Sequence, residues 1–409
     1  MICDQVNGSS VRERQRSWAN AAQLSVALTI ALRVGLGAVM AFAWVAVMKY
    51  LPSDHFTDPL VYGDLPMPTS TLGHLTLGVW PRWDAIHHLS LSMRGYFDLS
   101  PGESIFYPLY AGITWLVARL IGGNHLVAGL VVATLSTAAT FGCLRMLADR
   151  LFGESTGRWA CFALATYPMA IFLIAPFTES LFLFLTLAAF LAAYSNRWWI
   201  AAILAALASL SRAPGMATAP SIAIIAWRQW SNSTPQPPLR ALPPFITAIV
   251  APIAAGIGFL VWRETAGLPP LLTVLREYVG TTVVNPFTGL LAAFRQWVQI
   301  WDLPTTLDML SAITFSCITV LMVLRPRWRK PELIVYMLIS LLVLFSRVTV
   351  GAASLKSLSR YVLVLFPAFL VIGDYLSTAR STFRFVYLLA SSTALIVLSA
   401  LYALWFPIG

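Results

Sequence analysis

Long apolar runs recur along the whole chain, and they limit its fold more than any other feature. Examples cover residues 21–32, 126–144, 181–194, 245–262, 307–324, 333–345 and 386–406. Many approach the roughly twenty residues that a helix needs to cross a bilayer. Of the 409 residues, 58% are hydrophobic and 11% are charged, whereas an ordinary soluble domain carries about 25% charged residues. The sequence therefore predicts an all-α, polytopic integral membrane protein with about eleven transmembrane helices.

A single transmembrane domain is expected from residue 21 to residue 409, after a cytoplasmic tail of residues 1–20. The tail carries Arg12, Arg14 and Arg16. The apolar stretch that follows runs on to Met48, which is too long for a secretory signal core, so it is interpreted as a retained first helix. We place the helices near 21–48, 126–146, 159–175, 179–195, 198–211, 214–228, 243–262, 306–324, 333–349, 361–377 and 385–406.

The basic residues are distributed unevenly over the predicted loops, and this distribution indicates which side each loop faces. With the amino terminus inside, most Arg and Lys residues fall in inside segments, including the cluster 325–330, as the positive-inside rule requires. This explains the net charge of +10, so no nucleic-acid partner is expected. The long loops 49–125 and 263–305 are expected on the outer or lumenal side, in the plasma membrane of a prokaryote or the endoplasmic reticulum membrane of a eukaryote.

Residues 106–120 are apolar enough to suggest one more crossing, but a crossing here would invert every later loop. The basic cluster 325–330 would then face outward, against the positive-inside rule. We therefore interpret 106–120 as an interfacial or re-entrant helix of the first outer loop. Its Tyr107, Tyr110 and Trp115 suit the headgroup region.

Neither a disulfide framework nor a metal site is indicated by the sequence. Four cysteines are scattered without CxxC spacing, and three fall inside predicted helices. Asp84 together with His87 and His88 offers ligands for a divalent ion, but no third strong ligand follows at a fixed spacing. A hydrogen-bonding role for the histidines is preferred, and no cofactor is expected.

The segment 80–88, Trp-Pro-Arg-Trp-Asp-Ala-Ile-His-His, carries the first candidate site residues. Asp84, His87 and His88 stand at i, i+3 and i+4, so they share one face if the stretch is helical. The flanking tryptophans are expected to shield Asp84 from water and so to raise its affinity for protons. Asp84 then suits a general base that takes a proton from a sugar hydroxyl. The alternative is that Asp84 pairs with Arg82 or caps a surface helix.

Three later segments place polar side chains at outer helix ends. Glu179 follows Pro176 and Thr178, which can end one helix and cap the next; Glu179 is expected to accept a hydrogen bond from a sugar hydroxyl, or only to serve the cap. Cations on the outer side invite a specific explanation, and a phosphate supplies one. The candidates are Arg212, Lys356 and Arg360, with Arg347 weaker. The alternatives are headgroup contact and snorkelling.

In their order these segments resemble the PIG-V type of GT-C glycosyltransferase, the second mannosyltransferase of glycosylphosphatidylinositol assembly and its prokaryotic relatives. The resemblance extends over residues 82–367, most of the chain. The matching pieces are Arg82-Trp83-Asp84-Ala85 with Gly95-Tyr96, Phe106-Tyr107-Pro108-Leu109-Tyr110, Phe177-Thr178-Glu179-Ser180, Ala208-Ser209-Leu210-Ser211-Arg212, and Arg360-Tyr361 with Phe366-Pro367.

The resemblance implies a GT-C-like fold in which the outer loop 49–125 is catalytic and Asp84 is the base. It implies inverting transfer of a hexose, mannose foremost, from a polyprenyl-phosphate sugar to a lipid-linked or glycan acceptor on the outer face. Donor phosphate binding is expected from Arg360, Lys356 and Arg212. The expected substrate-binding residues are Arg82, Trp83, His87, His88, Tyr96, Tyr107, Glu179 and Tyr361.

The chain departs from the family pattern in two places, at His87-His88 and at Ser211-Arg212-Ala213-Pro214, where Thr-Arg-Pro-Asn is commoner. The resemblance therefore indicates the reaction class and leaves the acceptor and the exact sugar open. The chain also has no Asp-x-Asp element for a metal and a nucleotide sugar, in agreement with a lipid-linked donor.

Two other functions remain open at the level of sequence. A transporter or lipid flippase would also collect polar groups among helices, and it predicts an internal repeat and polar residues near the middle of the bilayer. No repeat is visible, and apart from Arg33 the charges lie near helix ends. A non-catalytic subunit of a larger membrane complex would not need Asp84.

Overall fold

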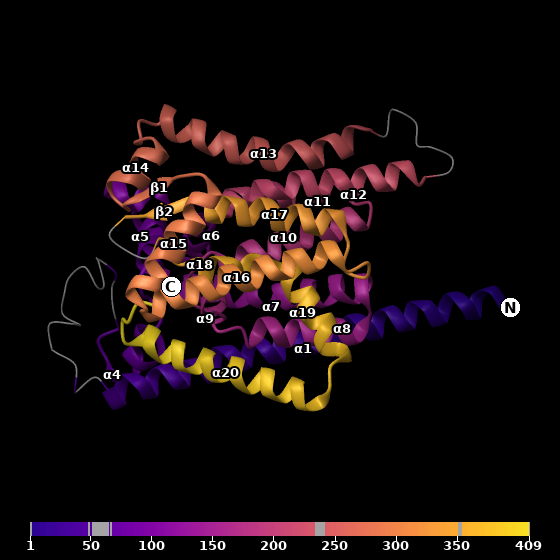
Figure 1. The fold of residues 1–409 in the computed structure, drawn as a ribbon, viewed down its shortest axis with the longest axis horizontal. Coiled ribbons are helices and arrows are strands. Elements are labelled where there is room, and N and C mark those ends of the chain that lie inside the picture. Colours follow the sequence, from indigo (N-terminus) through magenta and orange to yellow (C-terminus); the bar gives the residue numbers. More distant parts are fainter. Residues whose placement is uncertain are drawn as a thin grey trace.

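The computed structural model describes residues 2–47, 50, 65, 68–233, 242–350 and 354–408, with the backbone alone for 2–18. The chain is an all-α, multi-pass membrane protein, as predicted. Its long helices lie side by side, and the amino terminus extends from one end of the bundle (Figure 1). Part of the predicted outer loop, including His55, falls outside the described residues.

The described elements are named as in Figure 1, with η for 3₁₀ and π helices. They are α1 (Ile2–Val47), α4 (Thr71–Gly73), η2 (His74–Gly78), α5 (Asp84–Arg94), η3 (Pro101–Ile105), α6 (Pro108–Leu120), α7 (His125–Phe152), α8 (Glu154–Ala165), α9 (Ile171–Ile174), α10 (Glu179–Tyr194), α11 (Trp198–Ser211), η4 (Ala213–Ala217), α12 (Thr218–Ser231), α13 (Leu242–Thr265), α14 (Leu271–Glu277), β1 (Thr281–Val283), α15 (Pro286–Ile300), α16 (Leu303–Leu324), α17 (Pro331–Phe345), β2 (Arg347–Thr349), α18 (Leu358–Tyr361), η6 (Val362–Val364), α19 (Phe366–Thr378) and α20 (Ser381–Ala403).

Five of the described helices are long and apolar enough to cross a membrane. They are the 19–47 part of α1, together with α7, α13, α16 and α20. A sixth is counted if 358–364 and 366–378, which are bent by 78°, form one span. Helices α10, α11 and α17 are apolar but shorter. Each of the eleven predicted helices overlaps an observed one, while the number that crosses stays a prediction.

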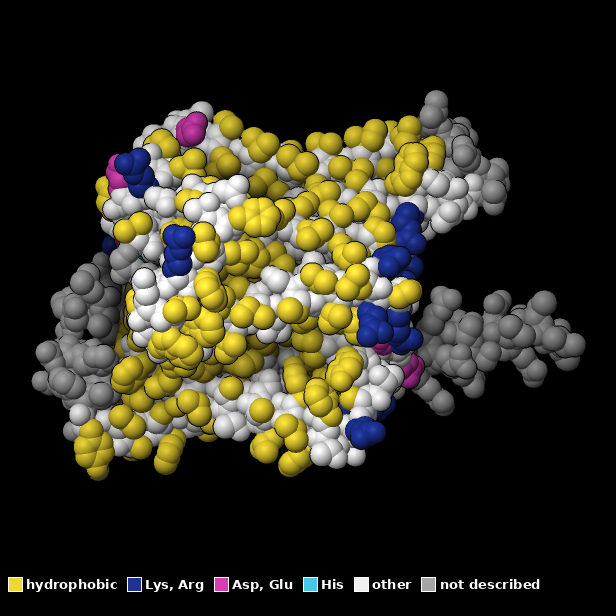
Figure 2. Space-filling view, in the orientation of Figure 1, with side chains coloured by type: hydrophobic (Ala, Val, Ile, Leu, Met, Phe, Trp, Pro, Cys, Tyr) yellow, Lys and Arg dark blue, Asp and Glu magenta, His cyan; other side chains and the backbone are white. Residues whose placement is uncertain are grey.

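The two ends of the bundle differ in structure and in charge. Helices α4, α5 and α14 lie with both strands at one end, which we call the site end, and the amino terminus lies at the other (Figure 1). On the face shown in Figure 2, most Lys and Arg side chains gather near the end that bears the amino terminus. This distribution is the one that the positive-inside rule associates with the cytoplasmic side. The outward orientation of the site end remains a prediction.

Helix α10 lies in the interior of the bundle. It packs on α7 and α11, and its Phe182 and Phe190 are fully buried. Helix α7 also packs on α1 and α8, and α8 packs on α19. The α8–α19 contact is close: a Cβ atom on Gly373 would overlap the backbone nitrogen of Ala160. A larger residue than glycine would therefore push these two helices apart.

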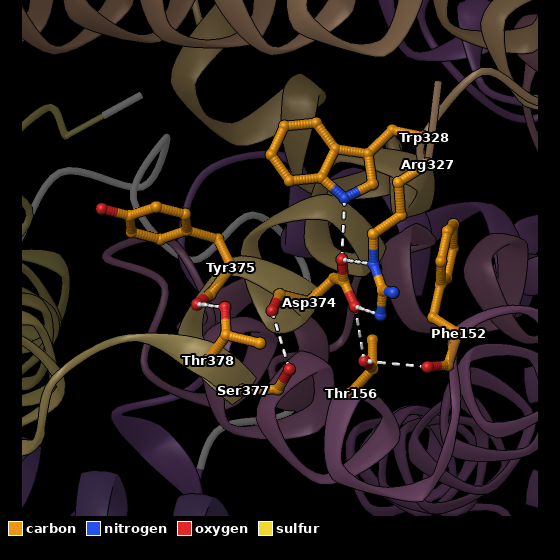
Figure 3. A network of polar contacts seen from close by, with 8 residues as sticks. All are labelled: Phe152, Thr156, Arg327, Trp328, Asp374, Tyr375, Ser377 and Thr378. Carbon is orange, nitrogen blue, oxygen red and sulfur yellow. Dashed lines mark hydrogen bonds and ion pairs between the residues drawn. The ribbon is translucent and has the colours of Figure 1, made fainter. Parts of the chain in front are cut away.

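A buried carboxylate ties three segments together away from the site end (Figure 3). Asp374 of α19 accepts hydrogen bonds from Arg327 Nε at 2.6 Å, from Trp328 Nε1 at 2.9 Å and from Thr156 Oγ1 at 2.8 Å. Thr156 belongs to α8, and Arg327 and Trp328 belong to the turn between α16 and α17. Part of the predicted cytoplasmic cluster thus fixes α19 against α8.

Prolines account for three departures from the predicted helices. The predicted helix 159–175 is interrupted before Pro168, and 361–377 is broken at Leu365, two residues before Pro367. The residue before a proline is disfavoured in the α conformation, which explains the end of the helix before Pro168. Pro367 has no N–H, and its ring clashes with the carbonyl four residues earlier, so α19 can begin around it but the preceding helix cannot run through it. The predicted helix 214–228 starts instead as the 3₁₀ turn η4, which contains Pro214.

The predicted helix 333–349 was wrong at its end, because α17 stops at Phe345 and residues 347–349 form strand β2. Strand β2 pairs antiparallel with β1, which lies in the predicted outer loop 263–305. Val283 is opposite Arg347, and the hydroxyls of Thr281 and Thr349 lie 3.1 Å apart. The two-stranded sheet therefore joins this loop to the residues that follow α17.

Candidate active site

Asp84 is the first residue of α5, at the site end. The residue before it, Trp83, has φ 54° and ψ −131°, a conformation that non-glycine residues rarely adopt and that clusters at functional sites. The Asp84 side chain is 35% exposed, and its Oδ2 lies 2.7 Å from Arg360 NH1. The alternative pairing of Asp84 with Arg82 is not the contact seen; the partner of Asp84 comes from α18.

Four charged residues from four parts of the sequence form a continuous chain of ion pairs. Arg360 contacts Asp84 through NH1 and Glu179 Oε1 through Nε, the latter at 2.5 Å. Arg212 NH1 lies 2.8 Å from the same Glu179 oxygen and donates to Thr178 Oγ1 at 2.9 Å. The order is therefore Asp84, Arg360, Glu179, Arg212. The segments that sequence analysis expected to meet are in direct contact.

The environment of Asp84 differs from the expectation in one respect. Burial acts to raise the pKa of Asp84, but the adjacent Arg360 guanidinium, with smaller contributions from His88 and His87, outweighs it and lowers the pKa to about 2. The expected rise in proton affinity is therefore wrong. That expectation rested on the tryptophans that shield Asp84 from water, and it did not include the Arg360 guanidinium that pairs with the carboxylate.

His88 lies one turn along α5 from Asp84 and is 2% exposed. Its ring packs edge-on against Phe106 and Tyr110, with centroids 4.5 and 5.5 Å apart. Burial lowers the pKa of His88 to about 3, so the imidazole is neutral at physiological pH. His88 Nδ1 has no hydrogen-bond partner among the described residues. A neutral, buried imidazole suits hydrogen bonding to a polar substrate rather than proton transfer.

A cavity of about 210 Å³ lies beside these residues. One part of its lining is polar and the other is apolar, the latter contributed by α14 and the end of α17. The polar and aromatic lining residues are Asp84, His88, Phe106, Tyr107, Thr178, Ser211, Arg212, Arg347, Arg360 and Tyr361. The apolar ones include Leu271, Leu275, Val343 and Leu344. Such a lining fits a ligand with a polar head and a hydrocarbon part.

Three guanidinium groups surround one aromatic ring in this cavity. The guanidinium carbons of Arg212, Arg347 and Arg360 lie 5.1, 5.2 and 5.4 Å from the ring centroid of Tyr361. Arg360 and Arg212 are neutralised by Glu179 and Asp84, whereas Arg347 forms no ion pair among the described residues. Arg347, the weaker candidate in sequence terms, is therefore the cation most available to an anionic ligand.

Several predicted substrate-binding residues lie away from the cavity. Arg82 is fully buried and donates to the carbonyls of Gly78, Pro81 and Ala403, which joins the start of α5 to the end of α20. Trp83 packs edge-on against Trp405. These contacts within the protein account for Arg82 and Trp83 as residues that stabilise the fold, without a bound substrate.

Four further predicted site residues also lie outside the cavity lining: His87, Tyr96, Glu179 and Lys356. His87 Nδ1 lies 3.2 Å from Glu103, and Tyr96 donates to the Phe106 carbonyl. Glu179 is fully buried behind Arg360 and does not line the cavity. Lys356 is exposed and lines a small neighbouring pocket with Arg347. Of this second group, Lys356 and the partly exposed His87 remain accessible to an approaching ligand.

Two expectations for the segment before α10 also change. Thr178 is the residue before the helix, but its hydroxyl makes no capping bond and accepts from Arg212 instead. Glu179 was expected to bind a sugar hydroxyl; in the structure it holds two arginines, and its Oε2 has no partner among the described residues. Two adjacent arginines supply the positive charge that a fully buried carboxylate requires.

Sequence reasoning missed Asp308, which lies in α16 and is 3% exposed. Its Oδ1 accepts a hydrogen bond of 2.8 Å from the backbone nitrogen of Ser359, the neighbour of Arg360. The signal was present, because an ionisable residue inside an apolar run is a functional candidate by default. Within the described residues, no group of three or more His, Cys, Asp or Glu side chains is arranged to hold a metal ion.

No protein-family model matches the sequence, and no curated protein matches it. Among solved structures, the chain is similar to ArnT from Cupriavidus metallidurans bound to undecaprenyl phosphate, with a TM-score of 0.46 and 16% identity over 75% of this chain and 57% of that one. It is also similar to the Archaeoglobus fulgidus oligosaccharyltransferase in complex with Zn and sulfate, with a TM-score of 0.46 and 13% identity over 95% of this chain and 53% of that one.

The same oligosaccharyltransferase tethered to an acceptor peptide containing the NVT sequon gives a TM-score of 0.43 and 13% identity, over 96% of this chain and 55% of that one. The chain spans slightly more than half the length of each of these three solved structures.

Proposed function

We propose that the chain is a membrane glycosyltransferase that moves a hexose, mannose foremost, from a polyprenyl-phosphate sugar to a glycolipid or glycan acceptor, with inversion at the anomeric carbon. One observation carries the proposal: a carboxylate, Asp84, and an arginine with no carboxylate partner among the described residues, Arg347, line the same partly apolar cavity. Inverting transfer from a lipid phosphate requires a base for the acceptor and a cation for the leaving group.

The reaction follows from this arrangement in a single displacement. The acceptor hydroxyl attacks the anomeric carbon and gives its proton to Asp84. The bond from that carbon to the phosphate oxygen breaks, and its electron pair stays on the phosphate. Arg347, aided by Arg212 and Lys356, stabilises the added negative charge. The polyprenyl chain occupies the apolar side of the cavity, next to α14 and α17.

The ion pair of Asp84 with Arg360 gives a reason for an ordered reaction. A carboxylate held by a guanidinium is a weak base, as its low pKa indicates. A donor phosphate competes with Asp84 for Arg360 and loosens this pair, so that Asp84 becomes more basic only when the donor is bound. The proposed site lies on the outer or lumenal face of the membrane.

The test is transfer by the purified protein from several polyprenyl-phosphate sugars, with mass spectrometry of the product. Asp84→Asn keeps the size of the side chain but removes the base, so it should lower transfer by ~10²–10⁴-fold. Glu264→Gln is the matched control, because Glu264 is an exposed acid beyond the cavity. Wild-type protein without transfer from any of these donors, or an Asp84→Asn variant as active as wild type, would refute the proposal.

A further inference from the structure

The peptide unit of Ser359, directly before Arg360, is held from both sides by buried side chains. Asp308 of α16 accepts from the Ser359 nitrogen at 2.8 Å. Tyr167, between α8 and α9, donates through its hydroxyl to the Ser359 carbonyl at 2.9 Å. Ser359 itself is 1% exposed. Two elements that contribute nothing to the cavity lining thus fix the backbone next to a residue that does.

Asp308 is an unusual residue for such a position. It lies within the otherwise apolar helix α16, and it forms no ion pair among the described residues. Its second oxygen, Oδ2, is buried without a hydrogen-bond partner in the described part of the chain. An ionisable side chain at membrane depth costs free energy and is retained where it serves function. Its hydrogen bond to Ser359 is the contact that can explain its presence.

The segment that Asp308 and Tyr167 hold has little support of its own. Helix α18 covers only Leu358–Tyr361, and it begins after Ser357, whose φ is 66°. The chain then bends by 78° before α19. A helix of one turn has few internal hydrogen bonds, so its direction depends on outside contacts. The direction of α18 decides where the Arg360 side chain points.

We propose that Asp308 and Tyr167 are positioning residues for Arg360: by holding the Ser359 peptide, they orient α18 so that one guanidinium reaches both Asp84 and Glu179. For its effect on catalysis, this inference rests on the proposed function. A shift of about 1 Å in a catalytic arrangement can cost 10²-fold in rate. The two hydrogen bonds to the Ser359 peptide, which we call the clamp, lie one residue from Arg360, so their loss should have a large effect on the rate.

Without the clamp, α18 shifts and Arg360 moves away from Asp84. The ionisable groups that remain around Asp84 are His87 and His88 on its own helix, Glu179 beyond it, and Arg212, Arg347, Tyr107 and Tyr361 around the cavity. An opposite charge within ~4–6 Å lowers a carboxyl pKa by about 1–3. Loss of the Arg360 contact should therefore raise the pKa of Asp84 by a similar amount.

The pKa of Asp84 can be measured without any substrate. Infrared difference spectra of the full-length protein across a pH titration give the band of the protonated carboxyl, and Asp84→Asn identifies it. Tyr167→Phe, which removes one oxygen atom, and Asp308→Ala should each raise the pKa of Asp84 by about one or more. Asp308→Asn keeps an oxygen that can accept from Ser359, so it should bring the pKa back toward the wild-type value.

Thr319→Val is the control, because Thr319 is buried in the same helix and its hydroxyl bonds only within that helix, to Phe315. An unchanged pKa of Asp84 in both Tyr167→Phe and Asp308→Ala overturns the inference. An equal rise of the Asp84 pKa in Thr319→Val also overturns it, since the effect would then follow from the loss of any polar side chain in α16.

Kinetics separate this inference from the proposed function. Tyr167→Phe should lower kcat about 10–100-fold with a nearly constant KM for the acceptor, and it should move the acid limb of the pH profile to higher pH. If the clamp variants raise the pKa of Asp84 but the wild-type protein transfers no sugar, the proposed function is refuted and the positioning role of Asp308 and Tyr167 stands. If transfer depends on Asp84 but the pKa of Asp84 is unchanged in these variants, the positioning role is refuted and the proposed function stands.

Discussion

Arg360 bonds to two carboxylates at once, and this sharing sets the charge of the cavity. Asp84 and Glu179 are both negative, while Arg360 and Arg212 balance them. What remains on the cavity wall is the charge of Arg347, with Lys356 beside it. If the cavity binds a phosphate, as proposed, its ligands are best sought among the cations that form no ion pair within the described part of the chain.

The pH dependence of kcat/KM follows from the pKa of Asp84. Because this pKa is about 2 in the free protein, Asp84 stays ionised as the pH falls, and only near pH 2 does it take up a proton. His88, with a pKa of about 3, stays neutral over the same range. We expect kcat/KM to remain level on the acid side from pH 7 down to about pH 4. An acid limb between pH 5 and 7 would contradict this assignment.

Arg347→Ala should weaken the binding of the donor. A hydrogen bond to a charged group contributes about 1.5–3 kcal/mol, so the KM for the donor should rise about 10–100-fold. The KM for the acceptor should change little. Arg276→Ala is the matched control, because Arg276 is an exposed arginine of α14 that does not line the cavity. A change confined to the acceptor would exclude Arg347 from the phosphate site.

At the level of elements, α18 and α19 show how a broken helix is held in place. The break places Arg360 at the cavity, and α19 beyond it lies close against α8 through Gly373 and Ala160. Asp374, the next residue, is fixed by Thr156 of α8 and by Arg327. The position of Arg360 is thus anchored from both directions along the chain, by Ser359 on one side and by α19 on the other.

Gly373→Ala tests this packing. The added Cβ would overlap the backbone nitrogen of Ala160, which cannot move without moving α8. Overpacking of this kind costs about 1–3 kcal/mol, so the variant should unfold at a lower temperature than wild type in detergent. Gly258→Ala is the control, because nothing lies within 4 Å of its added Cβ in α13. Equal melting temperatures for the two variants would show that the α8–α19 contact yields to the extra methyl group.

The helices could be predicted from local sequence patterns, whereas the features that depend on contacts between distant segments could not. Apolar runs predicted the elements, and Asp84, Arg212 and Arg360 were all identified from their positions at helix ends. Strand β2 was not predictable, because its partner β1 lies 66 residues away at the Thr282–Val348 pair. The two ion pairs of Glu179 were not predictable for the same reason: its arginine partners, Arg212 and Arg360, come from distant parts of the sequence.

For the whole molecule, charge and shape agree on an orientation. Helices α5 and α14, which contribute to the cavity lining, lie at the site end with both strands, and most Lys and Arg side chains in Figure 2 gather at the other end. The positive-inside rule therefore predicts that the site end faces outward. With this orientation, the proposed lipid-linked donor would reach the cavity from within the membrane.

Cysteine labelling tests this orientation. In a background with Cys3 and Cys317 replaced by serine, Glu264→Cys at the site end should react with a membrane-impermeant maleimide added to intact cells. Arg329→Cys, at the opposite end and equally exposed, should react only after permeabilisation. Cys143 and Cys161 are buried and give a low background. Labelling of Arg329→Cys in intact cells would reverse the orientation.

The pairing of β1 with β2 makes the position of Arg347 depend on a strand whose own residues do not line the cavity. Residues 281–283 hold the backbone of residues 347–349, and the two segments meet through a ladder and a buried pair of hydroxyls. Changes of sequence at residues 281–283 would therefore shift Arg347 while Asp84, held by Arg360, stays as it is. In the proposed reaction, donor binding and acceptor activation could in this way change independently of each other.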